Sequence, residues 1–190
     1  RDRHKVNGLI AQLMSPLATE TKKHQDAGRF VLFVGHVEIT GAKLTGAVQH
    51  GGSFEFSSGD LRSVGADAYA LAHIHIRQHV AGLPNANDGY LGCLCQLNFG
   101  EESNSVGCRL LEIQGRKILL DRWLDNKTSP RYFTVQTLDG LAYRPGIDNV
   151  KLRSLVKPDL LPEGIQFERL PQQVEARLRS DEKLDCDLSL

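Results

Sequence analysis

Apolar positions fall at helical spacing near the start of the chain and in short extended runs after it. Apolar residues at helical spacing predict a helix over residues 4–17. A continuous branched and aromatic run at residues 29–34 is short enough to be a strand buried on both faces. A second apolar run at residues 68–72 is also strand-like. Each run leads into histidine, the first at His36 and the second at His73 and His75.

Weaker patterns predict the other elements. A short strand is expected at residues 53–56, and the polar cluster at residues 57–60 predicts a turn. Further strands are expected at residues 108–114, 117–123, 131–136 and 150–156, with Gly115 in the turn between the first two, and a polar helix is expected at residues 162–179. The polar stretch at residues 125–130 marks a boundary, so we expect two domains, residues 1–126 and 127–190.

Composition limits the classes of function. The 190 residues are 41% hydrophobic, enough for one good core and a small second unit. Lys+Arg and Asp+Glu number 23 each, so net charge alone would not hold a polyanion. We find neither a membrane-spanning apolar run nor a signal peptide, and we expect a cytoplasmic protein without membrane partners. The cysteines lack C-x-x-C spacing and are expected to be reduced thiols: Cys93, Cys95, Cys108 and Cys186.

The histidines at the strand ends are the candidate chemistry. Side chains at i and i+2 of a strand point to the same side, so His73 and His75 would face one space if the extended backbone continues. His36 also follows an apolar strand, and strand ends are the usual ligand sites of α/β sheets. Three neutral imidazoles would bind Mn, Fe or Zn. The alternative is a set of histidines that are hydrogen-bonded at strand ends and bind no metal.

Three segments in order resemble a known family. They are FVGHVEITGA at residues 33–42, DAYALAHIHIRQ at residues 67–78 and YLGCLCQLNFGE at residues 90–101. Together they resemble the SbcD subunit of the bacterial SbcCD nuclease, which belongs to the double-strand-break-repair nucleases of the calcineurin-like metallophosphoesterases. The resemblance covers roughly residues 5 to 160, and three ordered motifs are more specific than any one of them.

The resemblance implies a fold and an activity. The expected fold is α/β: the C-terminal half of a metallophosphoesterase β-sandwich flanked by helices, followed by a small α+β cap domain that orients DNA. His36 and His73 would be ligands of the second metal, and His75 a ligand of the first. Two divalent ions, manganese by preference, would activate a water for in-line attack on a phosphodiester. The implied partners are DNA and an SMC-like ABC ATPase of SbcC type, and the implied location is the nucleoid.

The chain also departs from the family pattern. Ala72 stands where the family has glycine, and Cys93 where it has serine. The remaining family ligands and the catalytic histidine come from D-x-H, G-D-x-x-D and G-N-H motifs that would lie upstream. Asp2-Arg3-His4 has no strand before it, and Gly59-Asp60 is followed by Ser63 where the motif needs aspartate. We therefore expect part of a longer enzyme, inactive alone, with apolar faces that favour aggregation or a homodimer.

Two other functions stay open: a phosphoesterase acting on a small phosphoester, and a non-enzymatic binding module with a vestigial half-site. Basic residues of the expected cap would either contact DNA or form a solvated face: Arg131, Arg144, Lys151, Arg153 and Lys157. Residues 166–179 would be either the start of a partner-binding helix or an ordinary amphipathic helix of the cap.

Overall fold

The protein forms two compact units in a computed structural model. It describes all residues except 1–2, 45–54, 140, 155–159, 163–164 and 170–190. The first unit is Arg1–Gln96 with Ser103–Ser129, and the second is Leu97–Glu102 with Pro130–Leu190. The assignment of residues 1–126 to a nuclease part and 127–190 to a cap remains a prediction.

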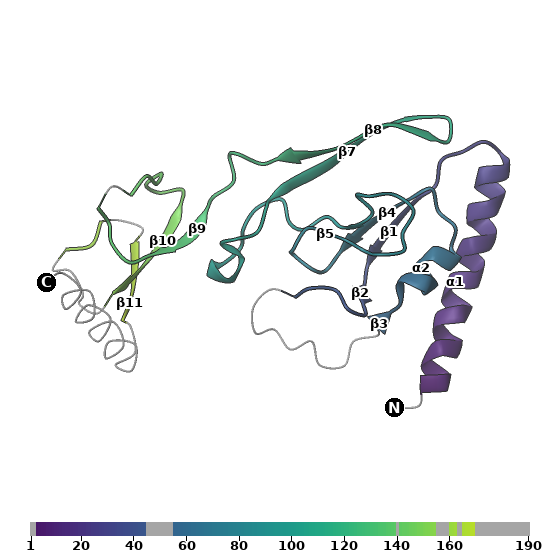
Figure 1. The fold of residues 1–190 in the computed structure, drawn as a ribbon, viewed down its shortest axis with the longest axis horizontal. Helices are drawn as coiled ribbons and strands as arrows, with labels where there is room; N and C mark the ends of the chain where they lie inside the picture. Colours follow the sequence, from purple (N-terminus) through teal and green to yellow (C-terminus); the bar gives the residue numbers. More distant parts are fainter. Residues whose placement is uncertain (1–2, 45–54, 140, 155–159, 163–164, 170–190) are drawn as a thin grey trace, which may run out of the picture. The chain divides into compact units, whose positions relative to one another are not determined.

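The first unit carries both α-helices of the described chain and most of its strands (Figure 1). In chain order its elements are α1 (Arg3–Asp26), β1 (Leu32–His36), β2 (Glu38–Ile39), β3 (Glu55–Phe56), α2 (Ser58–Ser63), β4 (Ala68–Ala72), β5 (Gln78–His79), β6 (Gly89–Tyr90), β7 (Gly107–Gln114) and β8 (Lys117–Asp125). One sheet has the order β1-β4-β6-β5, in which β1, β4 and β6 are parallel and β5 is antiparallel to β6. β2 and β3 form a parallel pair, and β7 and β8 an antiparallel hairpin.

The second unit is a small parallel sheet with one short 3₁₀ helix. Its described elements are η1 (Phe99–Glu101), β9 (Tyr132–Val135), β10 (Asn149–Ser154) and β11 (Ile165–Arg169). The strand order is β11-β10-β9, with β10 in the centre. Val150 and Leu152 of β10 are its buried apolar side chains, at 0% and 3% exposure.

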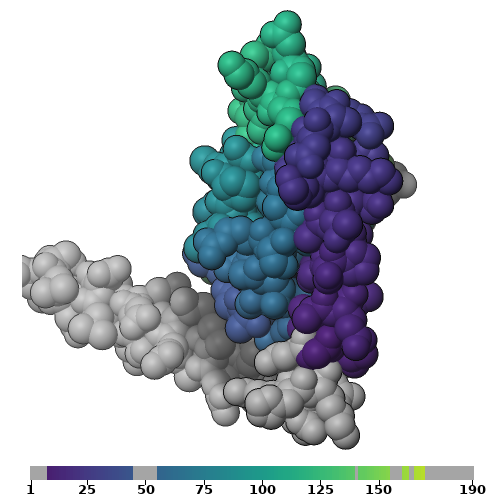
Figure 2. All heavy atoms as spheres, turned by 90° about the vertical axis from the view of Figure 1, so that its right-hand side faces the viewer, coloured from purple at the N-terminus to yellow at the C-terminus, as the bar shows by residue number. Residues whose placement is uncertain are grey.

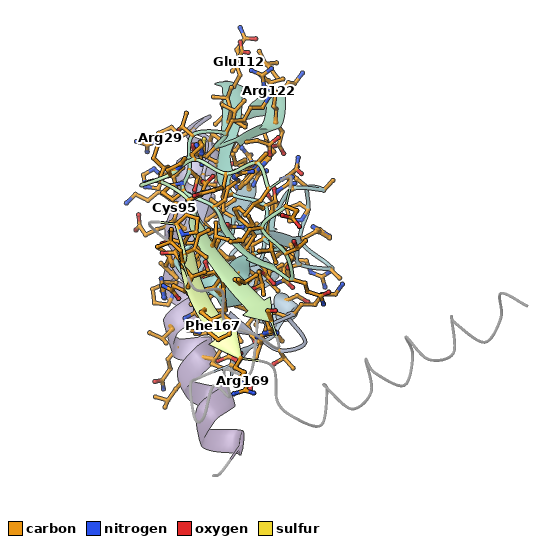
Figure 3. The ribbon with its side chains drawn as sticks, turned by 90° about the vertical axis from the view of Figure 1, so that its left-hand side faces the viewer. Arg29, Cys95, Glu112, Arg122, Phe167 and Arg169 are labelled. Carbon is orange, nitrogen blue, oxygen red and sulfur yellow. The ribbon has the colours of Figure 1, made fainter. Side chains whose placement is uncertain are left out.

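The expected fold class is wrong. The described chain consists mostly of strands in four small sheets with two α-helices, and it is not an α/β β-sandwich flanked by helices. The helix expected at residues 162–179 is a strand where it is described, from Ile165 to Arg169 (Figure 3), and residues 170–179 lie outside the described part. Ile165 and Phe167 alternate with the polar Gln166 and Glu168, a period of two that favours a strand.

The first strand also differs from its prediction. It runs from Leu32 to His36 rather than over residues 29–34, and it is not buried on both faces, since Leu32 is 40% and Val34 71% exposed. A strand becomes buried on both faces only when it is covered on both faces, and β1 lies at the edge of the described sheet. The apolar run therefore predicted a strand correctly and its surroundings incorrectly.

Local signals explain the other boundaries. Ser57 caps α2 and Asp60 completes a capping box, so the expected turn at residues 57–60 is a helix start. α1 continues to Asp26 with Pro16 inside it. The strand at Ala68–Ala72 is confirmed, as is the β7–β8 hairpin with Gly115 at its turn; Figure 3 labels Glu112 and Arg122 on its two strands.

The core of the first unit lies among α1, α2 and the four-stranded sheet. In Figure 2 the purple spheres of α1 extend along one side of this unit, beside the blue segments. The buried hydrophobic side chains are Ile10, Met14, Ile39, Phe56, Leu61, Val64, Ala66, Tyr69, Leu71, Ile74, Val80, Leu83 and Tyr90. Neither α-helix of the described residues is both long and apolar enough to cross a membrane.

Candidate functional site

His36 and His73 meet at the carboxyl ends of two neighbouring strands. β1 and β4 are parallel, with His36 paired in register to Ala72, so His73 follows directly beside it. His36 Nε2 lies 3.3 Å from His73 Nδ1, and the two ring centroids are 5.1 Å apart in an edge-on arrangement. The fold therefore joins two of the three histidines singled out in the sequence, although 37 positions separate them.

His73 has an unusual backbone. Its φ is 98°, and it is the only non-glycine residue with positive φ in the part of the chain that the structure describes. A side-chain-bearing residue held in such a conformation costs on the order of 1–3 kcal/mol, and such strain gathers at functional sites. The sequence drew attention to Ala72, where the resembling family has glycine, whereas the positive φ falls one residue later.

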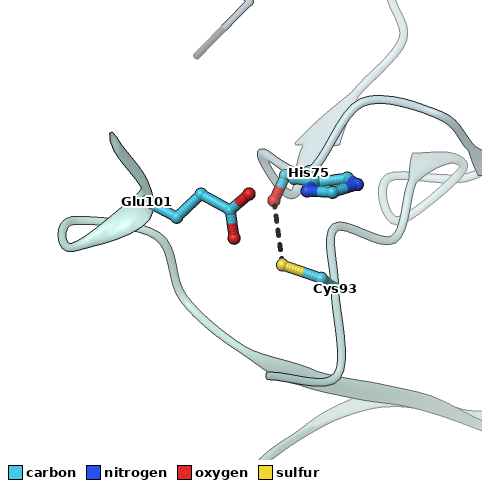
Figure 4. Close-up of side chains that lie close together, drawn as sticks. All are labelled: His75, Cys93 and Glu101. Atoms are coloured by element: carbon cyan, nitrogen blue, oxygen red, sulfur yellow. Dashed lines mark hydrogen bonds between the residues drawn. The ribbon is translucent and has the colours of Figure 1, made fainter. Parts of the chain in front are cut away.

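His75 lies beyond the end of β4, so the alternation of side chains expected from the sequence does not apply to it. β4 ends at Ala72, and residues 73–77 are not a strand, so alternation of side chains cannot be carried from His73 to His75. The backbone carbonyl of His75 accepts hydrogen bonds from Cys93 Sγ at 3.7 Å (Figure 4) and from Asn104 Nδ2 at 3.2 Å. A ring nitrogen of His75 and the Cys93 sulfur lie within 4.8 Å of each other.

Figure 4 also draws Glu101, which belongs to the second unit. There its carboxylate accepts from the backbone N–H of Leu97 at 2.9 Å and from the Asn98 amide at 3.3 Å. These bonds hold the chain at η1, where the Asn98 side chain also caps the helix.

Tyr90 of β6 holds the segment that follows His36. Its hydroxyl accepts from the backbone N–H of Ile39 at 2.8 Å and donates to the carbonyl of Val37 at 2.9 Å. Tyr90 is 2% exposed, and this burial raises the pKa of its phenol, which keeps the proton that Val37 accepts. The tyrosine of the third resembling motif thus positions the histidine of the first.

Gly92 lies against the segment that contains His75, and Gln78 ties the end of that segment to Lys43, which follows the first motif. Gly92 has φ of 72°, and a Cβ there would lie 3.0 Å from the Arg77 nitrogen and 3.1 Å from the His75 carbonyl oxygen. The Gln78 side chain accepts from the Lys43 N–H and donates to the Lys43 carbonyl, both at 2.8 Å. Sequence reasoning assigned no role to Tyr90, Gly92 or Gln78, although all three stand in the motifs that carry the resemblance.

A buried ionic network supports β4, the strand that leads into His73. Asp88, which is fully buried, accepts from the Tyr69 N–H and from Arg109, each at 3.0 Å. Arg109 also donates to the Tyr69 carbonyl and pairs with Asp121. Burial acts to lower the Arg109 pKa, but Asp121 and Asp88 outweigh it and raise that pKa, while Arg109 lowers the Asp121 pKa. These charges fix the strand from which His73 emerges.

The donor atoms fit a transition metal. Two imidazole nitrogens bound to one tetrahedral cation, at about 2.1 Å each, lie roughly 3.4 Å apart, close to the observed His36–His73 separation. His75 and Cys93 offer a second group of donors. The Cys93 thiol, which donates to the His75 carbonyl, would have to lose its proton to become a sulfur ligand, and such a ligand suits zinc better than manganese.

Gly59-Asp60, which imitates the G-D-x-x-D motif of the resembling family, does not contribute to this site. The Asp60 carboxylate accepts from the backbone N–H and the hydroxyl of Ser57, both at 2.7 Å, so Gly59-Asp60 serves the start of α2. Asp2 lies outside the described residues. Cys93, Cys95 and Cys108 form no disulfide among the described residues, and Cys186 lies outside the described part.

Four basic residues of the second unit pair with carboxylates. Arg131 and Arg144 both pair with the fully buried Asp148. Lys151 and Arg153 pair with Glu168. Each of these four side chains thus has an ion-pair partner within the unit, although four cations share two carboxylates, and this pairing favours the solvated-face interpretation. Lys157 falls outside the described residues, and contact of this unit with DNA remains a prediction.

Comparison with known proteins does not add a family: no protein-family model matches the chain, and no curated protein is significantly similar to it. The functional argument therefore depends on the motif order and on the contacts described above.

Proposed function

We propose that the chain is part of a metal-dependent DNA nuclease of SbcD type, which hydrolyses phosphodiester bonds at DNA ends during double-strand-break repair. In this proposal it acts in the cytoplasm, on nucleoid DNA, with an SbcC-type ATPase as partner. The observation that carries the proposal is the contact between His36 and His73, because each comes from a separate resembling motif and both lie at carboxyl strand ends.

In this proposal the histidines hold divalent cations. His36 and His73 would ligate one cation, and His75 would contribute to a second. When bound, such cations, manganese by preference, activate a water and stabilise the charge that develops on the phosphoryl oxygens. Tyr90 keeps His36 in place through the Val37 and Ile39 backbone.

The chain alone is expected to be inactive. Two divalent cations a few ångströms apart need a bridging carboxylate, and neutral imidazoles do not offset their charge. The sequence contains no Asn-His pair to provide the histidine that protonates the leaving group in the resembling family. Catalysis would require these groups from further polypeptide.

The same contact supports a second candidate, a non-enzymatic binding module with a vestigial half-site. A separation of 3.3 Å also suits a hydrogen bond in which one neutral imidazole donates and the other accepts. In that case the histidines would hold β1 and β4 together and bind no cation.

Cation binding separates these candidates. We expect Mn²⁺ or Zn²⁺, titrated into the protein and followed by calorimetry, to bind with an affinity that falls at least about tenfold in His36→Ala and in His73→Ala. His24→Ala, on the exposed part of α1, is the matched control and should bind as the wild type does. Equal affinity in all four proteins would overturn the metal site and leave the binding module.

A further inference from the structure

A small polar pocket lies between the β5–β6 end of the four-stranded sheet and the β7–β8 hairpin, all within the first unit. Its volume is about 200 Å³, and its lining includes Arg77, His79 and Asn87 together with Arg109 and Trp123 of the hairpin. Two guanidinium groups and an imidazole thus line the pocket, whereas none of its described lining residues is acidic. Such a set of side chains suits an anion.

Arg77 is exposed, yet two contacts hold its guanidinium in place. Its Cζ lies 4.6 Å from the centroid of the Trp123 ring, and its Nη2 donates to Asn87 Oδ1 at 3.2 Å. Trp123 is itself fixed, because its indole N–H donates to Asp125 at 2.9 Å and its ring lies so close to Gly107 that a Cβ there would approach it to 2.9 Å. No carboxylate of the described residues lies within ion-pair distance of Arg77. A rigid guanidinium without a carboxylate partner is suited to bind a phosphate.

The buried ionic network that supports β4 also fixes the walls of this pocket. Asp121 accepts from Arg109 and from the Asn87 amide, and these bonds lower its pKa. Arg109, whose side chain is 4% exposed, also pairs with the fully buried Asp88. The Asp88 carbonyl lies 2.9 Å from His79 Nδ1, and since a carbonyl only accepts, this nitrogen carries a proton. Arg77, through Asn87, and His79 are thus both connected to Asp88 in the core.

We propose that this pocket binds one backbone phosphate of DNA, with Arg77 as the phosphate-binding residue and Asn87 and Trp123 as the residues that position it. The pocket adjoins the segment of His75, since a Cβ at Gly92 would lie 3.0 Å from the Arg77 nitrogen and 3.1 Å from the His75 carbonyl oxygen. The proposal rests on the proposed nuclease function, and it adds to that function a contact with the DNA backbone that does not use the cation pair.

The charges around the pocket favour a phosphodiester over a phosphomonoester. Asp88 and Asp121 exceed Arg109 by one negative charge, so Arg77 brings the group to neutrality. A phosphodiester adds one negative charge, whereas a phosphomonoester adds about 1.5 to 2 at neutral pH. The additional charge would lie near Asp121, which is close enough to Arg77 to feel its charge, with no further cation to offset it. The volume also suits a single phosphate, because sites for larger ligands enclose roughly 300–1,000 Å³.

The salt dependence of DNA binding tests the proposal. Fluorescence anisotropy of a labelled DNA duplex, measured in EDTA at several NaCl concentrations, gives the slope of log affinity against log salt. Arg77→Gln should weaken binding about tenfold for any sequence and make this slope shallower by about 0.9, the contribution of one phosphate contact. Arg77→Lys should keep the slope and bind more weakly than the wild type, because the charge stays and the planar fork is lost. Arg122→Gln, an exposed arginine of β8 outside the pocket (Figure 3), is the control and should leave affinity and slope unchanged.

Three results would overturn the proposal. One is a wild-type protein that does not bind DNA. Another is an equal change of slope in Arg77→Gln and Arg122→Gln, which would indicate diffuse attraction by surface charge. The third is competition by thymidine monophosphate that is stronger than competition by the dinucleotide thymidylyl-thymidine, which would assign the pocket to a phosphomonoester. Because EDTA removes divalent cations, failure of the metal site would leave these results unchanged, and a confirmed metal site with equal slopes would refute the pocket alone.

Discussion

Tyr90 fixes the backbone that follows His36. Its buried hydroxyl uses both its donor and its acceptor on the backbone immediately after this histidine. The histidines themselves could be found from the sequence, because an apolar strand followed by histidine is a visible pattern. A tyrosine that binds the backbone across 51 and 53 positions has no local signature, and only its place in a resembling motif drew attention to it.

We predict that Tyr90→Phe weakens cation binding as well as the fold. Phenylalanine fills the same space but removes the partner of the buried Ile39 N–H and of the half-buried Val37 carbonyl, which should cost about 1–3 kcal/mol in urea unfolding. Tyr69→Phe is the control, because it removes a buried hydroxyl bonded to Ala66 and Leu61, away from His36. Both should destabilise, and only Tyr90→Phe should reduce Mn²⁺ affinity. Equal affinity in the two variants would show that Tyr90 is merely structural.

Because His73 has a positive φ, we expect glycine to be more stabilising than alanine at this position, the reverse of their usual order. Glycine tolerates φ of 98° and alanine does not, so His73→Gly should be more stable than His73→Ala by about 1 kcal/mol in urea unfolding. At His79, in the strand β5, the order should reverse, since glycine weakens strands. If alanine proved better than glycine at both positions, the positive φ at His73 would be contradicted.

At the scale of elements, pattern spacing predicted strands better than it predicted their surroundings. The strand at Ala68–Ala72 follows from an apolar run, and the β7–β8 hairpin from two strand-like segments with a glycine turn between them. β1 was expected to be buried on both faces. That expectation failed because a continuous apolar run does not show what covers the strand. β11 was not predicted, because its polar residues were taken as part of a polar helix. Their alternation with Ile165 and Phe167 indicates a strand.

Asp148 joins the ends of elements in the second unit and gives that unit a pH dependence. Its carboxylate binds Arg131 next to β9 and Arg144 in the segment before β10. Burial acts to raise the Asp148 pKa, but hydrogen bonds from Arg144 and Arg131 outweigh it and hold that pKa well below its usual range. The ion pairs of Asp148 therefore stabilise the fold fully above the unfolded-state pKa of about 3.9. This stability is lost as the pH falls below that value.

We predict that Asp148→Asn lowers the free energy of unfolding at neutral pH by about 1–3 kcal/mol. It should also reduce the further loss of stability in acid, because the titrating group is gone. Asp139→Asn, an exposed carboxylate in the same unit, is the control and should change little. Unfolding followed at neutral and acidic pH measures both effects, and a variant with the acid sensitivity of the wild type would contradict this role.

For the whole molecule, composition correctly limited the chain to a core and a smaller second unit, and the fold class inferred from resemblance was wrong. The resemblance directed attention to three histidines, of which the fold brings His36 and His73 into contact. It could not give the position of His75, because that depends on where β4 ends. Long-range pairing of strands, which decides such contacts, leaves little trace in local spacing.

The central claim is that His36 and His73 form a metal-binding pair. The most direct test is a crystal structure of the protein soaked with Mn²⁺, with data collected near the manganese absorption edge. We predict an anomalous difference peak within coordination distance of both His36 Nε2 and His73 Nδ1. A map without a peak at this position, with the two imidazoles still hydrogen-bonded to each other, would contradict it.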